Sequence, residues 1–329
     1  MSRQKTINKI KRAFKAKEES LYLSHLNLDS IPKEIGLLDR LKSLNLSGNN
    51  LNSLPQAIEK MEFLEELNLG NNKFDDVPSE IDELISLKNL NLEKNLLTDL
   101  PSEIGKLLNL ETLKLNDNQI TNLPSEIGNL INLKDLDLMS NELKILPSEI
   151  GKLHNLDMLS LDFNQLSDLP QSITELSNLT YLGLSYNRLS QPPSVIWELE
   201  TLTFLILNGN HIANLSSEIK NLAELLHLEI CDNTLSTLPP EIGKLSNLEE
   251  LLLHTNNISV LPKEIGQLSS LQWLNLSGNQ LTELPKEICQ LKELEELDID
   301  DNPIKNIPDE TKRMGIKAIL KYLKNSFEG

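Results

Sequence analysis

The sequence has few of the residues that secreted, disulfide-stabilised or membrane-spanning proteins need. Two cysteines, Cys231 and Cys289, stand far apart in a chain of 329 residues, so no disulfide framework is present and a reducing compartment is expected. No apolar run approaches the roughly 18 residues that cross a bilayer. Aromatic residues make up 4% of the chain. Because they are scarce, a place where several gather is informative.

Negative charge outweighs positive charge, and only the two ends of the chain carry a net positive charge. The chain carries a net charge of −18, yet residues 1–19 hold seven basic and two acidic side chains, and residues 309–329 hold five and three. The central part therefore carries a net −25. Such a surface repels phosphate backbones and acidic membranes, so we expect no nucleic acid partner and no membrane partner. A protein partner with a basic patch is favoured.

The segment from Met1 to Glu19 lacks the apolar run of a signal peptide. We therefore expect a cytoplasmic location. The alternative is translocation into the cytosol of a host cell by a non-classical secretion system.

The chain is rich in one feature, a repeat of 23 residues that asparagine marks without a slip. The asparagines are Asn49, Asn72, Asn95, Asn118, Asn141, Asn164, Asn187, Asn210, Asn233, Asn256, Asn279 and Asn302. Aliphatic residues precede each by eight, five and three places, as Leu110, Leu113 and Leu115 precede Asn118. A fixed period of this length predicts a solenoid of stacked repeats. Alternation within it predicts a short strand with one apolar face.

The asparagine follows the strand at the point where the chain turns. Its amide can satisfy backbone groups in the buried bend, each of which would otherwise cost about 1–3 kcal/mol. We predict that this asparagine ladder is structural.

The pattern LxxLxLxxNxL resembles the leucine-rich repeat, and its longer form LPxEIGxLxNLxxLxLxxNxL resembles the 23-residue bacterial and Ras-group cytosolic type. The resemblance covers residues 21–308 as thirteen repeats. It implies an α/β fold, a right-handed leucine-rich-repeat solenoid (horseshoe) with a parallel concave β-sheet and short helical turns on the convex side. It implies a binding surface and not a reaction.

The N-terminal residues 1–20 are expected to form a basic amphipathic helix that caps the first repeat. Ile7, Ile10 and Phe14 lie at helical spacing among lysines and arginines. An uncovered solenoid end would expose core leucines and a free strand edge, which favours the cap. The alternative is a basic helix that lies on an acidic membrane.

Residues 309–329 are expected to form a second capping helix. One apolar stripe runs through Ile316, Ile319, Leu320, Leu323 and Phe327. The segment from Gly315 to Leu323 resembles the helix that ends the repeat domain of Roc-type GTPase proteins. No GxxxxGK[ST] motif occurs in the sequence, so a GTPase is not expected in this chain.

The candidate protein-binding surface lies on strand positions that point away from the leucine core. Exposed aromatic and apolar groups there are not needed for core packing, and such clusters mark binding surfaces. We call them the predicted patch: Met158, Phe163, Tyr181, Tyr186, Phe204, Ile206, His227, Leu252, His254 and Trp273. The alternative is that these groups stack on one another and merely cover the sheet.

A secondary acidic set flanks the predicted patch and could steer a basic partner. It consists of Asp135, Asp137, Glu296, Asp298 and Asp300. The alternative is a solvated face without a partner.

Two arrangements could in principle carry chemistry. Cys231 and His254 occupy equivalent positions of neighbouring strands, where a histidine could activate a thiolate. An open sheet offers neither a cleft nor evident oxyanion donors, so we expect no enzyme activity. His227, His254, Cys231 and Glu250 would converge poorly on a metal ion. No metal or cofactor is expected.

These patterns predict a non-catalytic protein–protein interaction module that binds its partner on the concave face. The favoured hypothesis is a bacterial effector or interaction protein that binds a host protein. The alternative is a cytosolic signalling scaffold for a small GTPase or a phosphatase. A hydrolase that uses Cys231 and His254 is the remote alternative. The sequence does not determine the oligomeric state.

Overall fold

The computed structural model describes residues 3–328, and their side chains up to residue 325. Phe327 and the start of the expected N-terminal cap, residues 1 and 2, lie outside these described side chains. The chain forms two compact units. The first comprises Met1–Gln165 and Pro170–Asn178, and the second comprises Leu166–Leu169 and Leu179–Gly329.

Within each unit, three-residue strands pair in parallel and in chain order. The first unit holds β1 (Ser20–Tyr22), β2 (Ser43–Asn45), β3 (Glu66–Asn68), β4 (Asn89–Asn91), β5 (Thr112–Lys114), β6 (Asp135–Asp137) and β7 (Met158–Ser160). The second holds β8 (Tyr181–Gly183), β9 (Phe204–Ile206), β10 (His227–Glu229), β11 (Glu250–Leu252), β12 (Trp273–Asn275) and β13 (Glu296–Asp298).

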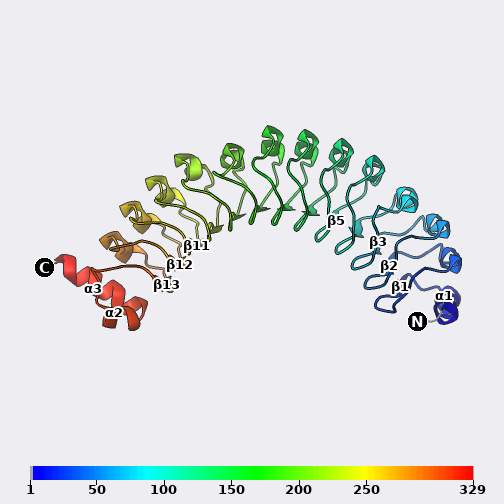
Figure 1. The fold of residues 1–329 in the computed structure, drawn as a ribbon, viewed down its shortest axis with the longest axis horizontal. Coiled ribbons are helices and arrows are strands. Elements are labelled where there is room, and N and C mark those ends of the chain that lie inside the picture. The colour runs from blue at the N-terminus through cyan, green and yellow to red at the C-terminus, as the bar shows by residue number, and fades with distance from the viewer. Residues whose placement is uncertain (1–2, 329) are drawn as a thin grey trace. The chain divides into compact units, whose positions relative to one another are not determined.

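On the other side of each unit, 3₁₀ helices of five residues follow one another (Figure 1). The first unit holds η1 (Lys33–Leu37), η2 (Gln56–Lys60), η3 (Ser79–Glu83), η4 (Ser102–Lys106), η5 (Ser125–Asn129), η6 (Ser148–Lys152) and η7 (Gln171–Glu175). The second holds η8 (Ser194–Glu198), η9 (Ser217–Asn221), η10 (Pro240–Lys244), η11 (Lys263–Gln267) and η12 (Lys286–Gln290). The predicted parallel strands and short helical turns are confirmed.

The apolar core lies between the strands and the 3₁₀ helices. In the repeat around β5, Leu113 and Leu115 are fully buried, while Thr112 and Lys114 are partly exposed on the opposite side of the strand. Ile104 in η4 and Leu107, which directly follows η4, close the same core. The alternation therefore leaves one side of each strand free, and we call this side the strand face.

The ladder asparagines bind backbone groups of two successive repeats. Asn118 donates from Nδ2 to the carbonyl oxygens of Leu92 and Leu115 at 3.0 and 2.9 Å, and its Oδ1 accepts from the Leu97 N–H at 3.1 Å. Eleven of the twelve are buried, from Asn49 to Asn279. Each amide thus supplies the partners that the buried bend would otherwise lack.

Proline and glycine shape the 3₁₀ side. Pro101 precedes η4 with φ −70° and ψ 152°, an extended conformation that proline favours just before a helical turn. In the repeat that lacks this proline, the Ser216 hydroxyl accepts from the Glu218 N–H instead. A Cβ at Gly105 would lie 2.7 Å from the carbonyl oxygen of Glu126 in the next repeat. Glycine therefore allows neighbouring repeats to approach closely.

Helices occupy both ends of the chain. Helix α1 (Arg3–Ala16) packs beside η1 and buries Thr6, Ile10 and Ala13. Phe14, which the sequence placed on the apolar stripe, is 49% exposed.

At the other end, α2 (Asp309–Arg313) leads into α3 (Ile316–Glu328). Helix α3 packs against η12 and buries Ile319 and Leu323. No helix among the described residues is long and apolar enough to cross a membrane.

Candidate functional site

Three ring side chains form a row on the strand face of the second unit. Tyr181, Phe204 and His227 begin β8, β9 and β10 and lie in register across the sheet. The ring centroids of Tyr181 and Phe204 are 6.4 Å apart, and those of Phe204 and His227 are 5.6 Å apart. These are contact distances for tilted aromatic pairs. We call these three residues the aromatic row.

Two carboxylates hold the imidazole of His227. Its Nε2 lies 2.6 Å from Oε1 of Glu229, and its Nδ1 lies 2.6 Å from Oε2 of Glu250. Both ring nitrogens can donate at once only when the imidazole is protonated. The Glu229 hydrogen bond, partly offset by burial, raises the pKa of His227. The same hydrogen bond lowers the pKa of Glu229.

Asn208 connects this cluster to the backbone. Its Nδ2 donates to Oε2 of Glu229 at 2.5 Å, and its Oδ1 accepts from the Cys231 N–H at 2.7 Å. The imidazole therefore has a fixed position beside the partly exposed ring of Phe204. The predicted patch omitted Glu229 and Asn208, although their repeat positions on β10 and after β9 place them beside His227.

Tyr186 adds a fourth ring at the end of the strand face. Its backbone adopts a left-handed conformation with φ 52°, which is costly for a bulky residue. Most other repeats have glycine, asparagine, aspartate or a small or flexible side chain there. A Cβ on Gly209 would lie 2.4 Å from the Tyr186 ring, so the ring packs directly over that glycine. The side chain is nevertheless 45% exposed.

The remaining members of the predicted patch divide between the two units. In the second unit, Trp273 on β12 is 40% exposed, and Ile206, Leu252 and His254 are partly exposed. Met158 and Phe163 are exposed in the first unit. The sequence therefore identified side chains on the strand face, and the second unit brings most of them onto adjacent strands.

Some members of the acidic set form hydrogen bonds with the backbone, and others are exposed to solvent. Oδ1 of Asp137 accepts from the Met139 N–H at 3.1 Å, and Oδ1 of Asp298 accepts from the Asp300 N–H at 3.0 Å. Burial raises the pKa of Asp137 and, in the same unit, of Asp135. Glu296 and Asp300 are exposed, so they are the members of this set most available to a partner.

The chemistry of Cys231 does not suit a nucleophile. The residue is 3% exposed, and burial raises its pKa to about 12. A nucleophilic cysteine needs a lowered pKa. The buried Nδ1 of His254 makes no hydrogen bond in the described part of the chain. The thiol therefore stays protonated at neutral pH, which argues against the Cys231–His254 hydrolase.

Among the described residues, no three histidine, cysteine, aspartate or glutamate side chains lie where they could hold one metal ion.

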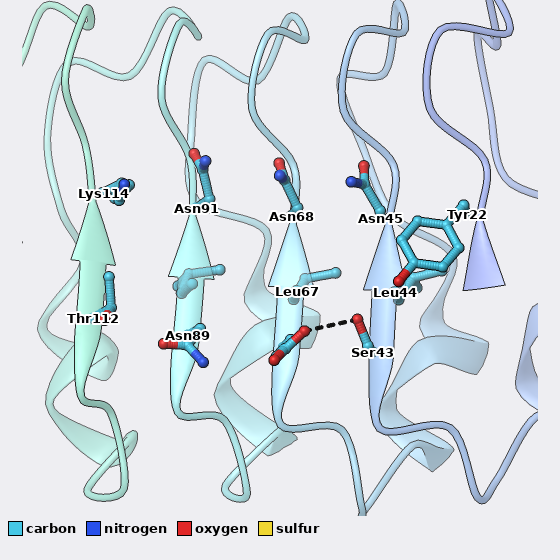
Figure 2. Close-up of a pocket in the computed structure, with 12 residues that line it drawn as sticks. Tyr22, Ser43, Leu44, Asn45, Leu67, Asn68, Asn89, Asn91, Thr112 and Lys114 are labelled. Carbon is cyan, nitrogen blue, oxygen red and sulfur yellow. Dashed lines mark hydrogen bonds between the residues drawn. The ribbon is translucent and has the colours of Figure 1, made fainter. Parts of the chain in front are cut away.

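A groove on the strand face of the first unit was missed by the sequence analysis. It has a volume of about 330 Å³ and runs over β1 to β5 (Figure 2). Its lining includes Tyr22, Asn45, Asn68, Asn91 and Lys114, which occupy one position of five successive repeats. The recurrence of asparagine at one repeat position can be read from the sequence. Polar side chains are common on an exposed strand face, however, so this recurrence did not indicate a groove.

Comparison with known proteins gives the family. The model described as "Leucine rich repeat" matches residues 19–74 and 246–304, and the model described as "Leucine-rich repeat region" matches residues 125–191. Another "Leucine Rich Repeat" model matches residues 109–130. No curated protein sequence matches significantly.

Solved structures provide longer matches. A leucine-rich repeat protein of Leptospira interrogans is 36% identical with a TM-score of 0.58, over 92% of this chain and 95% of its own. An internalin of Listeria monocytogenes is 26% identical with a TM-score of 0.81, over 91% and 89%. The plant peptide hormone receptor RGFR1, solved in complex with RGF2, is 32% identical with a TM-score of 0.70, over 83% of this chain and 49% of its own. This chain thus spans about half of that receptor.

The chain belongs to the leucine-rich repeat family. The Leptospira protein supports this assignment by its identity and by the near-complete coverage of both chains.

Proposed function

We propose that the chain is a non-catalytic protein-interaction module that binds its partner on the strand face of the second unit. The observation that carries this proposal is the aromatic row, which is partly exposed and in which Glu229 and Glu250 hold the His227 ring in place. Fixed aromatic side chains lose little conformational entropy on binding, so they serve as anchors at interfaces. Tyr186 adds a ring that is 45% exposed, at a left-handed turn position where a bulky side chain is costly and most other repeats have a smaller or more flexible residue.

The partner has a basic patch. The repeats carry a large negative charge, and Glu296, Asp298 and Asp300 lie at the last strand beyond Trp273. Opposite charges increase the rate of encounter and exclude acidic competitors more than they increase affinity. In the first unit, Asp135 and Asp137 provide the negative charge that attracts the basic partner.

The biological setting that we propose is a bacterial interaction protein or effector that binds a host protein, from the cytoplasm or after translocation into the host cytosol. The similarity to the Leptospira interrogans protein and to the Listeria monocytogenes internalin supports a bacterial member of the family. The period of 23 residues supports the bacterial and Ras-group type of repeat. A scaffold for a small GTPase or phosphatase is the competing setting.

Affinity capture from bacterial and eukaryotic lysates tests the site. The native chain is compared with a Tyr181→Glu, Phe204→Glu variant. The matched control is Leu108→Glu, Ile131→Glu, which alters two residues of the 3₁₀ side that are 53% and 55% exposed. We expect a protein that the native chain and the control retain and that the variant loses.

The captured protein is then titrated as a purified species at low and high salt. Weaker binding at high salt is expected for a basic partner. Equal retention by all three chains would exclude the aromatic row as the site. A GTPase whose capture depends on its bound nucleotide would favour the scaffold over the effector.

A further inference from the structure

A row of amides lies in the groove of the first unit, and folding uses only the oxygens of these amides. Asn45, Asn68 and Asn91 end β2, β3 and β4 and lie in register. Figure 2 shows the three amides side by side, with Tyr22 at one end and Lys114 at the other. Strands in a sheet are about 4.8 Å apart, so the row repeats at that spacing. We call Asn45, Asn68 and Asn91 the amide row.

Each amide of the row has a fixed orientation. The Oδ1 atoms of Asn45, Asn68 and Asn91 accept from the backbone N–H two residues further on, at 3.0, 2.9 and 2.8 Å. This bond fixes the oxygen toward the backbone and directs the NH₂ group away from it. Among the described residues, these NH₂ groups donate to no protein acceptor. The groove thus presents an aligned set of preorganised donors.

The ends and the second row of the groove add complementary groups. Tyr22 is 59% exposed, and Figure 2 shows its ring face-on at the edge of the row. Below the amides lie Ser43, Glu66, Asn89 and Thr112, and the Ser43 hydroxyl donates to Glu66 at 2.9 Å. Glu66 and Lys114 leave the lining without net charge. The volume of about 330 Å³ lies at the small end of the range for ligand sites.

The spacing of the row discriminates between ligands. An extended peptide presents carbonyl groups to one side every second residue, about 6.6–6.8 Å apart, which does not match the strand spacing. In an extended β-1,4-linked chain of pyranose sugars, each ring with its glycosidic bond advances by about one strand spacing. Successive rings are inverted, but both edges of a ring carry oxygens, so every ring can present an acceptor to the strand beneath it. Each ring carries oxygens that accept hydrogen bonds and an apolar C–H face that packs on an aromatic ring. A neutral sugar chain is also unaffected by the negative charge of the repeats.

We propose that this groove binds a neutral β-1,4-linked oligosaccharide that runs across β1 to β5. One sugar lies on each strand step, and the NH₂ groups of the amide row donate to its hydroxyl or acetamido oxygens. The terminal sugar packs its C–H face on Tyr22, and Lys114 donates to an oxygen at the other end. This site is separate from the aromatic row and does not depend on the proposed protein partner.

Calorimetric titration of the full chain with pentasaccharides tests this proposal. The β-1,4-linked probes are cellopentaose and chitopentaose, and the α-linked control is maltopentaose. We expect saturable binding of a β-linked probe and none of maltopentaose. The Asn68→Asp variant keeps the oxygen that accepts from the Gly70 N–H but loses the donor, so its affinity falls about tenfold.

We expect the Asn68→Asp variant to fold, because Asp137 and Asp298 make the same backbone hydrogen bond at the same repeat position. Asn275→Asp, which changes the matching residue on β12, is the control and keeps native affinity. Tyr22→Ala weakens binding through loss of the stacking surface. Binding that is unchanged in both Asn68→Asp and Tyr22→Ala, or no binding of either β-linked probe, overturns the proposal. Binding of pentaglycine in place of the sugars would overturn it in favour of a peptide.

Discussion

The Nε2 atom of His227 lies 2.6 Å from Oε1 of Glu229, within a strand of three residues. Because residues two apart on a strand point to the same side, His227 and Glu229 both stand on the strand face. Glu250, in register with His227 on β11, supplies the second carboxylate. The protonated imidazole is thereby fixed beside Phe204, where a cation also interacts favourably with the ring.

This ion-paired histidine predicts a pH-dependent stability. The pKa of His227 is raised, so its contribution is complete below the unfolded pKa of about 6.5 and is lost as pH rises through the folded pKa. The pKa of Glu229 is lowered, so its contribution is present above about 4.5 and is lost as pH falls through the folded pKa. We expect His227→Gln to cost about 1 kcal/mol between these limits and less at high pH.

Urea unfolding of the native and His227→Gln chains at several pH values measures this difference. His211→Gln is the control, because His211 is exposed and its ring bonds to no carboxylate among the described contacts. A difference between native and His227→Gln chains that stays constant from pH 5 to pH 9 would contradict the assigned ion pair.

The hydrogen bonds of the asparagine ladder predict a large loss of stability when one of its asparagines is replaced. Asn118→Ala removes the partners of the Leu92 and Leu115 carbonyl oxygens and of the Leu97 N–H, all in the buried bend. We expect a loss of about 3 kcal/mol in the free energy of unfolding. Asn122→Ala, an exposed change whose amide bonds to neighbouring Thr121, should cost little. Similar values for the two variants would show that the ladder is not what stabilises the bend.

The strands and turns could be predicted from the sequence because the period determines them. With an aliphatic residue at fixed distances from each asparagine, one register buries all of these residues, as Leu113 and Leu115 illustrate. The helix at the N-terminus was harder to predict. Three apolar positions indicated its stripe, but Thr6 and Ala13 are buried where Phe14 is exposed, because contact with η1 selects the buried side.

The location of the candidate site could be predicted from the sequence, but the hydrogen bonds between its side chains could not. The repeat position shows that His227 stands on the strand face between Phe204 and Glu250. It does not show that Asn208 orients Glu229, because that depends on the rotamers of side chains from neighbouring repeats. The amide row was missed for a similar reason. Its value as a donor set depends on Oδ1 atoms that are already bonded to the backbone.

Burial of Cys231 predicts that its thiol is alkylated slowly. With a pKa of about 12, its thiolate at pH 8 is about a thousandfold rarer than that of a cysteine with the ordinary value of 9.0. We expect alkylation by iodoacetamide, followed by peptide mass spectrometry, to modify Cys231 about a thousandfold more slowly than a free cysteine peptide. The same reaction after unfolding in urea is the control and should be fast. Rapid alkylation of the folded chain would revive a nucleophilic role for this residue.

The contact between Tyr186 and Gly209 predicts unequal effects of the same substitution in two repeats. Gly209 and Gly278 occupy one repeat position with φ of 62° and 65°, so alanine is strained in both, by about 1–2 kcal/mol. At Gly278 the nearest atoms, those of Thr255, lie 3.4 to 3.6 Å from the added Cβ, which is ordinary contact. At Gly209 the added Cβ would lie 2.4 Å from the Tyr186 ring, which must move. We therefore expect Gly209→Ala to destabilise more than Gly278→Ala in urea unfolding and, unlike it, to weaken binding of the captured partner. Equal losses of stability would mean that the ring does not rest on this glycine, and its exposed position would then need another explanation.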